Sequence, residues 1–336
     1  MYNVEEKRWY THYPWKFDRS ALPRNDKGAL KLLQSLERSL QKKPEVAKEY
    51  SEQIQSMIDR GVAVLLSEEE LKAWKGDYYY LPIVGVKSKN KPLRVCFDAA
   101  RKQFGSPSMN DCLFKGPDRF INNLLSVLLG FRDGRIGCAA DIKKFHNQVY
   151  LFEEDIHMQR FLWRDMDPTK PPQTYAVVVN NFGIKPANCI ATSALHSSAD
   201  DYAPIYPVES QEVKKRTYID DGLTAAQNKP KAVVKTQRWD EILDHCSMQN
   251  KGWTFTGDDK SDVVIGGDQI DVEKVLGMAW DPKADSFIFK TRLHLKLNVK
   301  RSVDESHEIS STEELVQYKG QLMTRRQLLS NVHRIF

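Results

Sequence analysis

The chain lacks several features that would assign it to a specialised class of protein. No run of apolar residues approaches the roughly 18 that a membrane-spanning helix needs. Its five cysteines are scattered and odd in number, without the C-x-x-C spacing of a zinc site, so we expect reduced core thiols rather than a disulfide framework. The stretch from Met1 to Tyr10 is charged and aromatic, which excludes a secretory signal. These absences favour an intracellular protein.

A large excess of charge of one sign is also missing. Lysine and arginine number 50, aspartate and glutamate number 45, and the net charge is +5. Binding to nucleic acid would therefore have to come from local clusters of basic side chains. The hydrophobic content of 41% is typical of a soluble globular protein. A chain of 336 residues can bury a sizeable core, and its length suggests two or three subdomains.

The first part of the chain has the pattern of helices. Apolar residues recur at helical spacing over residues 28–59, and Pro44 predicts a break between two helices. Ser67 is followed by three glutamates, which predicts an N-cap with an acidic first turn. We interpret the lysines of the first two helices as solvated surface rather than as a nucleic-acid groove.

Residues 78–97 change to the pattern of strands. Residues 79–86 and 93–97 are rich in β-branched and aromatic side chains, and residues 87–91 between them contain three lysines. The segment therefore predicts a β-hairpin with a basic tip. Such a tip is either a plain surface turn or a loop that closes over phosphate groups.

The rest of the chain alternates strands with helices. The helices and strands that we expect are at residues 119–134, 149–152, 161–163, 175–179, 191–202, 233–246 and 281–290. Because hairpins are mixed with helices that cover one face of a sheet, the predicted fold class is α+β.

The most informative feature is the pair Asp220 and Asp221, which lies where two short apolar runs meet and precedes Gly222. This order predicts a strand, a tight turn and a second strand. Adjacent carboxylates repel each other, and a bound divalent cation removes the repulsion. The alternative is a solvent-facing turn in which Asp and Gly only supply permissive backbone angles.

A third carboxylate favours the metal interpretation. Asp141 ends a run of small apolar residues at 136–140, so we expect it at the rim of a sheet. A buried carboxylate needs a metal, a base or water beside it, although an ordinary strand-end aspartate is the alternative. Three carboxylates on neighbouring strands fit a two-metal site for nucleotidyl transfer. In such a site one ion activates the attacking 3′ oxygen and the other stabilises the leaving pyrophosphate.

Nine short blocks occur in an order that covers most of the chain, from about residue 28 to residue 336. They are residues 93–100 (LRVCFDAA), 109–118 (MNDCLFKGPD), 140–144 (ADIKK), 159–165 (QRFLWRD), 181–187 (NFGIKPA), 218–221 (YIDD), 251–254 (KGWT), 276–280 (LGMAW) and 325–330 (RRQLLS). In this order they resemble the reverse transcriptase of BEL/Pao-type long-terminal-repeat retrotransposon polyproteins. Each block alone is weakly specific, whereas the ordered set is specific.

The resemblance implies a right-hand polymerase fold, with fingers and an antiparallel palm sheet backed by helices. It implies an N-terminal helical extension over residues 1–77, fingers and palm over residues 78–275, and a primer-grip hairpin with the start of a thumb over residues 276–336. The family's chain ordinarily continues further, so we expect a truncated thumb. The chain would then be a fragment of a polyprotein, or a decayed or co-opted copy.

The resemblance also implies roles for individual residues. Asp141, Asp220 and Asp221 are implied to be catalytic and to hold two Mg²⁺ ions, which Mn²⁺ can replace. The residues implied to bind the incoming deoxynucleotide are Arg94, Lys87, His146, Phe182, Gly183 and Lys251. The primer grip is implied at Leu276, Gly277 and Met278. Gly183 is expected to bring bare backbone close to the nucleotide. Lys251 is either a proton donor to the leaving pyrophosphate or a plain surface lysine.

Three positions depart from the family's pattern. His146 stands where a Phe or Tyr usually excludes a 2′-hydroxyl, so sugar selectivity is an open question. Ile83 and Val84 replace a pair of histidines, which we interpret as a packing variation. Ser247 and Met248 replace the Gly-Phe pair that usually precedes Lys251. All three aspartates are retained, which favours activity.

The predicted function is that of an RNA-directed and DNA-directed DNA polymerase, which extends a primer 3′-OH with deoxynucleoside triphosphates. The alternatives are an inactive or domesticated nucleic-acid-binding fragment and a structural fragment of a polyprotein. The expected partners are a primed RNA or DNA template, deoxynucleotides and other parts of the same polyprotein, with no membrane. The expected location is the cytoplasm, with virus-like particles or a nuclear stage as further options.

Overall fold

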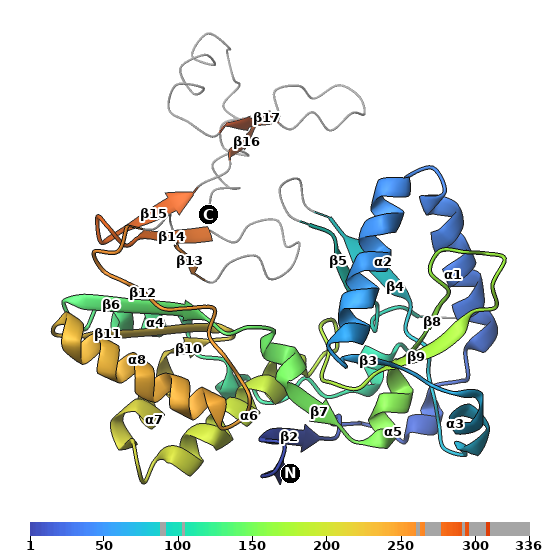
Figure 1. The fold of residues 1–336 in the computed structure, drawn as a ribbon, viewed down its shortest axis with the longest axis horizontal. Coiled ribbons are helices and arrows are strands. Elements are labelled where there is room, and N and C mark those ends of the chain that lie inside the picture. The colour runs from blue at the N-terminus through green and yellow to red at the C-terminus, as the bar shows by residue number, and fades with distance from the viewer. Residues whose placement is uncertain are drawn as a thin grey trace. The chain divides into compact units, whose positions relative to one another are not determined.

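The computed structural model describes residues 1–87, 92–102, 105–259, 263–265, 277–290, 293–295 and 307–309 (Figure 1). The chain divides into two compact units, Met1–Trp253 and Thr254–Phe336. Helices and small sheets alternate in the described residues, so the predicted mixture of α and β structure is confirmed. The predicted boundaries at residues 77 and 275 stay predictions, because compactness alone does not distinguish fingers, palm and thumb.

The described part of the chain contains eight α-helices and several short 3₁₀ turns. The α-helices are α1 (Asp26–Leu40), α2 (Pro44–Asp59), α3 (Glu68–Ala73), α4 (Leu124–Phe131), α5 (Glu153–Ile156), α6 (Ala187–Tyr202), α7 (Pro207–Arg216) and α8 (Lys229–Asp244). The 3₁₀ turns are η1 (Arg19–Ala21), η2 (Met109–Cys112), η3 (Asp118–Phe120), η4 (Phe145–Gln148) and η5 (His157–Gln159). Within these described segments, no helix combines the length and the apolar composition that crossing a membrane requires.

The strands are short and form small sheets. In the first unit they are β1 (Tyr2–Asn3), β2 (Arg8–Thr11), β3 (Ala63–Leu65), β4 (Ile83–Val86), β5 (Arg94–Phe97), β6 (Ile136–Asp141), β7 (Val149–Leu151), β8 (Arg160–Trp163), β9 (Gln173–Val177), β10 (Thr217–Tyr218) and β11 (Asp221–Ala226). In the second unit they are β12 (Thr254–Phe255), β13 (Val263–Ile265), β14 (Gly277–Asp281), β15 (Ser286–Lys290), β16 (Leu293–Leu295) and β17 (His307–Ile309).

Local sequence signals explain the first helices. Pro44 is at the first turn of α2, where its missing amide N–H costs nothing, and this confirms the predicted break between α1 and α2. At α3, the Ser67 hydroxyl accepts a hydrogen bond from the Glu70 amide (3.1 Å), and the Glu70 carboxylate accepts one from the Ser67 amide (2.7 Å). This capping box satisfies two of the donors that a helix start leaves open.

The predicted basic hairpin is confirmed as the antiparallel pair β4–β5, in which Val86 faces Arg94. It packs on α2, and the sheet β3-β9-β8 lies in the same part of the first unit. The first strand is shorter than the predicted 79–86. Tyr80 forms only an isolated parallel bridge with Arg160 of β8, and its own N–H and C=O bind the side-chain amide of Asn25. Lys89 and Lys91 lie outside the described residues.

The sheet that carries Asp141 and Asp221 has β10, β11 and β6 side by side in that order, all antiparallel. Helices α4, α7 and α8 pack against β11, which agrees with the expected antiparallel sheet backed by helices. The interior of strand β6, residues 137–140, consists of small residues because its neighbours are close. A Cβ on Gly137 would lie 2.7 Å from the ring of Phe131 on α4.

The predicted helix at 119–134 is wrong at both ends, because α4 covers only Leu124–Phe131. The Asn122 side-chain amide donates to the carbonyl oxygens of Lys214 (2.8 Å) and Thr217 (2.7 Å), which ties the preceding segment to α7 and β10. Asn123 then caps α4 by accepting from the Ser126 amide (3.2 Å). These tertiary bonds outweigh the continuous apolar pattern.

The N-terminal arm, residues 1–25, forms part of the first unit in a way that the sequence did not predict. Strand β2 pairs in parallel with β7, so Trp9 faces Val149. The Trp9 indole N–H donates to the hydroxyl of Ser198 on α6 (2.9 Å). A four-residue strand whose partner is far away in the chain has too little local pattern to be recognised.

Within the second unit, β13, β14 and β15 form an antiparallel sheet in that order. This confirms the strand pair that we expected from alternating residues over 281–290, with the first strand starting earlier. Of the predicted primer-grip residues, Gly277 and Met278 are the first two residues of β14 and face Lys290 and Phe289 of β15. Leu276 lies outside the described residues.

Candidate active site

Asp141 and Asp221 are direct neighbours on adjacent strands. Asp141 is the last residue of β6, Asp221 is the first residue of β11, and the two are cross-strand partners. Opposite residues of an antiparallel pair project from the same face with Cβ atoms about 5 Å apart. The sheet therefore brings two carboxylates together at its rim, as the sequence predicted. Like charges in this position destabilise a sheet, so the pair requires a positive partner.

Asp220 lies in the tight turn that precedes β11. Because Tyr218 pairs with Asp221, the turn consists of Ile219 and Asp220 alone. The turn therefore lies one residue earlier than we expected from the position of Gly222. Gly222 itself belongs to strand β11, where an added Cβ would lie 3.1 Å from the Trp239 ring. The Asp220 carbonyl oxygen accepts the amide of the residue after Asp141 (2.8 Å), so all three aspartates lie at one end of this sheet.

Ile219 adopts a left-handed backbone conformation, with φ of 57°. Two-residue hairpin turns require this region, and glycine or asparagine usually occupies it. For a β-branched residue such a conformation is a true outlier and costs on the order of 1–3 kcal/mol. The side chain of Ile219 packs against the core cluster that includes Trp239. The flanking strands and this packing hold the strained turn in place beside the two carboxylates.

Lys251 supplies a positive charge to Asp141. Its ammonium Nζ lies 2.7 Å from Asp141 Oδ1, and its amide donates to the Asp141 carbonyl oxygen (2.8 Å). Oδ1 is buried and, among the described residues, accepts no well-aligned hydrogen bond, so the contact with Lys251 is an ion pair. A bridge between Ile142 and Asn250 fixes the Lys251 segment beside the end of β6.

A group of basic side chains surrounds this end of the sheet. Partial burial lowers the pKa of Lys144, and the positive charges of Arg60, Lys251 and Arg94 lower it further. Each of these three cations therefore lies close enough to Lys144 to repel it, although they come from separate segments of the first unit. Such a group favours binding of a polyanion. We did not predict Lys144 or Arg60. The pair of lysines at positions 143 and 144, close after Asp141, could have indicated Lys144. No residue near Arg60 in the sequence indicates its position.

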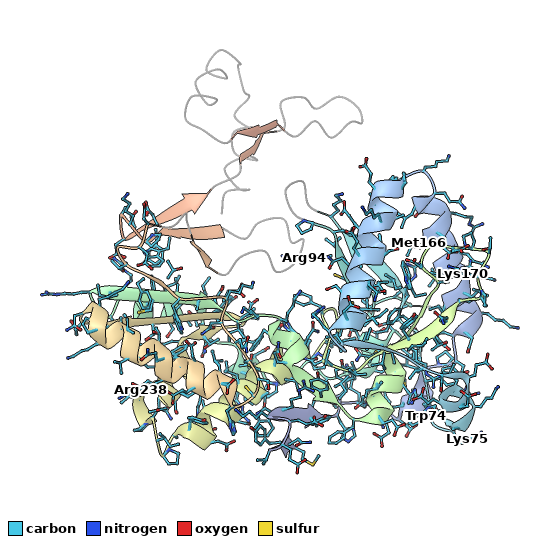
Figure 2. All side chains as sticks on the ribbon, viewed as in Figure 1. Trp74, Lys75, Arg94, Met166, Lys170 and Arg238 are labelled. Carbon is cyan, nitrogen blue, oxygen red and sulfur yellow. The ribbon has the colours of Figure 1, made fainter. Side chains whose placement is uncertain are left out.

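The two predicted finger residues differ in their surroundings. Lys87 forms an ion pair with Glu49 on α2, and this pairing lowers the pKa of Glu49. Glu49 also accepts the amide of Leu93 (3.2 Å), so Lys87 helps to fix the hairpin to α2. Arg94 is exposed at the start of β5 (Figure 2). Arg94 is therefore the better placed of the two for a phosphate.

His146 and Phe182 are in contact. The His146 ring is buried, its Nε2 hydrogen-bonds the Asn188 side chain, and its centre lies 4.6 Å from that of Phe182, edge to face. Burial lowers the pKa of His146, which favours the neutral ring. Phe182 is 39% exposed. The aromatic surface open to solvent here is therefore that of Phe182, with His146 as its support.

Gly183 has a structural reason to be glycine. Its φ is 89°, and an added Cβ would lie 2.6 Å from the carbonyl oxygen of Phe97. Any larger residue would push the loop away from β5. We expected the bare backbone of Gly183 to approach a nucleotide. Within the protein, it approaches the backbone of β5.

The chemistry of the three aspartates suits magnesium, because Mg²⁺ prefers carboxylate oxygens. The buried Oδ1 of Asp141 fits a coordinating oxygen, and Asp221 lies directly opposite. The fit is incomplete in the described part of the chain, where no three His, Cys, Asp or Glu side chains converge as a ready metal-ligand set. Lys251 takes the place of a counter-ion to Asp141 in this structure.

No protein-family model matches the chain, and no curated protein matches it significantly. The resemblance to BEL/Pao reverse transcriptases therefore stays a prediction from the residues.

Proposed function

We propose that the chain is an RNA-directed and DNA-directed DNA polymerase of the BEL/Pao retrotransposon type. The observation that carries the proposal is the cross-strand pairing of Asp141 with Asp221 at one end of the sheet of β10, β11 and β6. Asp220 lies beside them in a strained two-residue turn. A structural turn needs neither paired carboxylates nor a strained isoleucine, whereas an active site commonly contains both kinds of feature.

In this proposal the three aspartates hold two Mg²⁺ ions, with Mn²⁺ as a substitute. The ions would supply charge stabilisation for an in-line displacement at a phosphorus atom. Arg94, Lys144 and Arg60 offset the negative charge of the triphosphate, and Lys251 gives a proton to the leaving pyrophosphate. Lys251 would exchange its ion pair with Asp141 for this role.

The neighbouring loop would contact the sugar and base of the nucleotide. Phe182 presents an exposed ring, and the neutral His146 supports it from below. The right-hand arrangement of fingers, palm and thumb, including a primer grip at Gly277 and Met278, belongs to the same proposal. So do the primed template, the deoxynucleotides, the other polyprotein parts and the cytoplasmic location.

Primer extension on poly(rA)/oligo(dT) with Mg²⁺ tests the proposal. We expect extension by the parent chain, and a loss of at least about a thousandfold for Asp220→Asn, because a lost metal ligand removes several kcal/mol of transition-state stabilisation. Asp77→Asn is the matched control, since Asp77 is an exposed aspartate after α3. Equal extension by the parent and Asp220→Asn would refute the site assignment.

The ion pair between Lys251 and Asp141 supports a second candidate function. A lysine that satisfies a carboxylate lowers that site's need for a metal, as in an inactive, domesticated nucleic-acid-binding protein. In that case, the parent chain would bind a primer–template in a salt-dependent manner but would not extend it.

A further inference from the structure

A short antiparallel ladder joins the N-terminal arm to the segment that follows η2. The Lys16 amide donates to the Cys112 carbonyl oxygen (2.8 Å), and Trp15 pairs with Leu113. Leu113 is completely buried, whereas the next residue, Phe114, is 55% exposed. The ladder thus fixes its inner side chains in the core and presents the others to solvent.

Two phenylalanine rings are exposed at this ladder. Phe17 directly follows Lys16 and is 61% exposed, and the Lys16 ammonium lies 5.8 Å from the centre of the Phe114 ring. Neither ring belongs to the buried core clusters. Exposed rings interleaved with cations are the combination on which unpaired bases stack while their phosphates are neutralised.

Two ammonium groups lie on consecutive carbonyls of η2. Lys185 Nζ donates to the carbonyl oxygen of Asn110 (2.9 Å), and Lys16 Nζ donates to that of Asp111 (3.2 Å). Local desolvation and the Lys16 charge lower the pKa of Lys185. The carboxylate of Asp111 forms its ion pair with Lys102 (3.2 Å), and its charge offsets only part of the effect of Lys16 on Lys185. Within the described ranges no carboxylate forms an ion pair with Lys16 or Lys185, so this pair of charges favours an anion from outside.

The same segment is tied to the candidate active site. The Asn110 side-chain amide donates to the carbonyl oxygen of Gly183 (2.8 Å), and its side-chain oxygen accepts the amide of Lys185 (2.8 Å). Asn110 therefore couples the position of the two ammonium groups to the loop of Phe182 and Gly183.

We propose that Lys16, Phe17, Phe114 and Lys185, here called the basic–aromatic strip, bind the unpaired strand of a primer–template. Bases stack on the two phenylalanines, and phosphates lie at the two lysines. The proposal extends the proposed polymerase function. It depends on that function only for the statement that the bound strand is the template. A stable protein interface would instead need a broad apolar centre, whereas the strip alternates rings and charges.

The test is fluorescence anisotropy with the full chain and two labelled duplexes, one blunt and one with an unpaired template overhang of about ten nucleotides. The variants are Phe17→Ala/Phe114→Ala and Lys16→Gln/Lys185→Gln. The controls are Ile205→Ala, an apolar residue of equal exposure (62%), and Lys72→Gln, an exposed lysine on α3. All altered side chains are exposed, so thermal unfolding should match the parent.

We expect the parent to bind the overhang duplex more tightly than the blunt one. The ring variant should lose about tenfold or more of that difference, since stacking contributes about 1–3 kcal/mol per base. The lysine variant should reduce the slope of log affinity against log salt by about 1.4, at about 0.7 for each single-strand phosphate contact. Neither control should change these values.

Three outcomes would overturn the proposal. In the first, the variants lose as much affinity for the blunt duplex as for the overhang duplex. In the second, the ring variant binds the overhang duplex as tightly as Ile205→Ala does. The third is a parent dimer that the ring variant dissociates while overhang binding is unchanged, which would make the strip a protein interface. Overhang binding through the strip by a chain that does not extend primers would refute the polymerase proposal alone.

Discussion

Two aspartates of the first unit have opposite surroundings. Asp155 is completely buried, and both of its carboxylate oxygens are saturated with donors from the N-terminal arm. These donors are the His12 ring, the Tyr13 amide, the Trp15 indole and the Arg19 guanidinium, at distances of 2.7–3.1 Å. The Asp141 side chain is 39% exposed and has one ammonium as its partner, beside a second carboxylate and a strained turn.

The difference separates a carboxylate that holds the fold together from one that is available for chemistry. Burying a charge is costly unless every lone pair is satisfied, and the arm satisfies Asp155 completely. At Asp141 the protein instead keeps a second carboxylate and a strained turn beside an ion pair that is half exposed to solvent. The two regions can be distinguished by substitutions that act on stability in one and on activity in the other.

The largest effect on stability is expected from Asp155→Ala. It leaves Arg19 and the buried donors without their partner, and we expect the free energy of unfolding to fall by about 3–5 kcal/mol. Urea unfolding followed by tryptophan fluorescence measures this change. Asp118→Ala, at an aspartate that is 82% exposed in a surface ion pair with Lys115, should change it by less than about 1 kcal/mol. Equal losses of stability in Asp155→Ala and Asp118→Ala would show that Asp155 does not hold the fold together.

The next effect depends on pH and lies beside Asp155. Burial and the Arg160 charge lower the pKa of His157 from its ordinary 6.5 to about 4. Between these values the unfolded chain binds more protons than the folded one. The free energy of unfolding is therefore unaffected by protonation of His157 above pH 6.5. It falls as the pH drops toward 4, by at most about 3 kcal/mol.

The slope of unfolding free energy against pH should therefore be shallower in His157→Gln over that window. Glu70 and Glu153 face the same ring, so Glu70→Gln serves to separate their titration from that of the histidine. An unchanged slope in His157→Gln would show that the ring is not held neutral.

A smaller effect is expected at the strained turn. Ile219→Asn replaces a β-branched residue with one that tolerates φ of 57°, and relief of strain should outweigh the lost packing. We expect the free energy of unfolding to rise by up to about 1 kcal/mol. Ile205→Asn, outside the turn, should give no such gain. A loss larger than 1 kcal/mol would mean that packing of Ile219, and not its backbone, dominates.

The smallest change in stability is expected for Lys251→Gln. The ion pair with Asp141 is half exposed, with side-chain exposures of 58% and 39%, so its loss should cost less than about 1 kcal/mol. The rate of primer extension should nevertheless fall by about 10²-fold or more if Lys251 donates a proton. A large loss of stability would place Lys251 with Asp155 as a structural residue.

Sequence signals of short range predicted their parts of the fold correctly. The Ser67–Glu70 capping box, the break at Pro44 and the β4–β5 hairpin each depend on residues within a few positions of one another. The position of Asp141 at the end of a strand followed from its apolar neighbours in the same way. Its pairing with Asp221 is confirmed by the register of β6 and β11.

Contacts between distant segments could not be predicted. Nothing near Asp155 in the sequence indicates that residues 12–19 will saturate it, and nothing near Arg60 indicates that it will approach Lys144. The turn was placed one residue late because glycine is the usual left-handed residue, whereas here Ile219 adopts that conformation and packs against the core. Local sequence patterns therefore fail to predict positions that are determined by backbone strain or by contacts between distant segments.

The anchoring of Tyr2 on His245 sets an order for folding during synthesis. The Tyr2 hydroxyl donates to the His245 carbonyl oxygen, a contact that spans 243 residues. A ribosome must therefore release almost the whole first unit before the Tyr2 hydroxyl can reach this partner, although β1 pairs with the nearby β2. Contacts of such long range form slowly because a large loop must close first. The arm's partners at Cys112, in β7 and at Asp155 are synthesised earlier, so the contact with His245 is among the last that the arm can make.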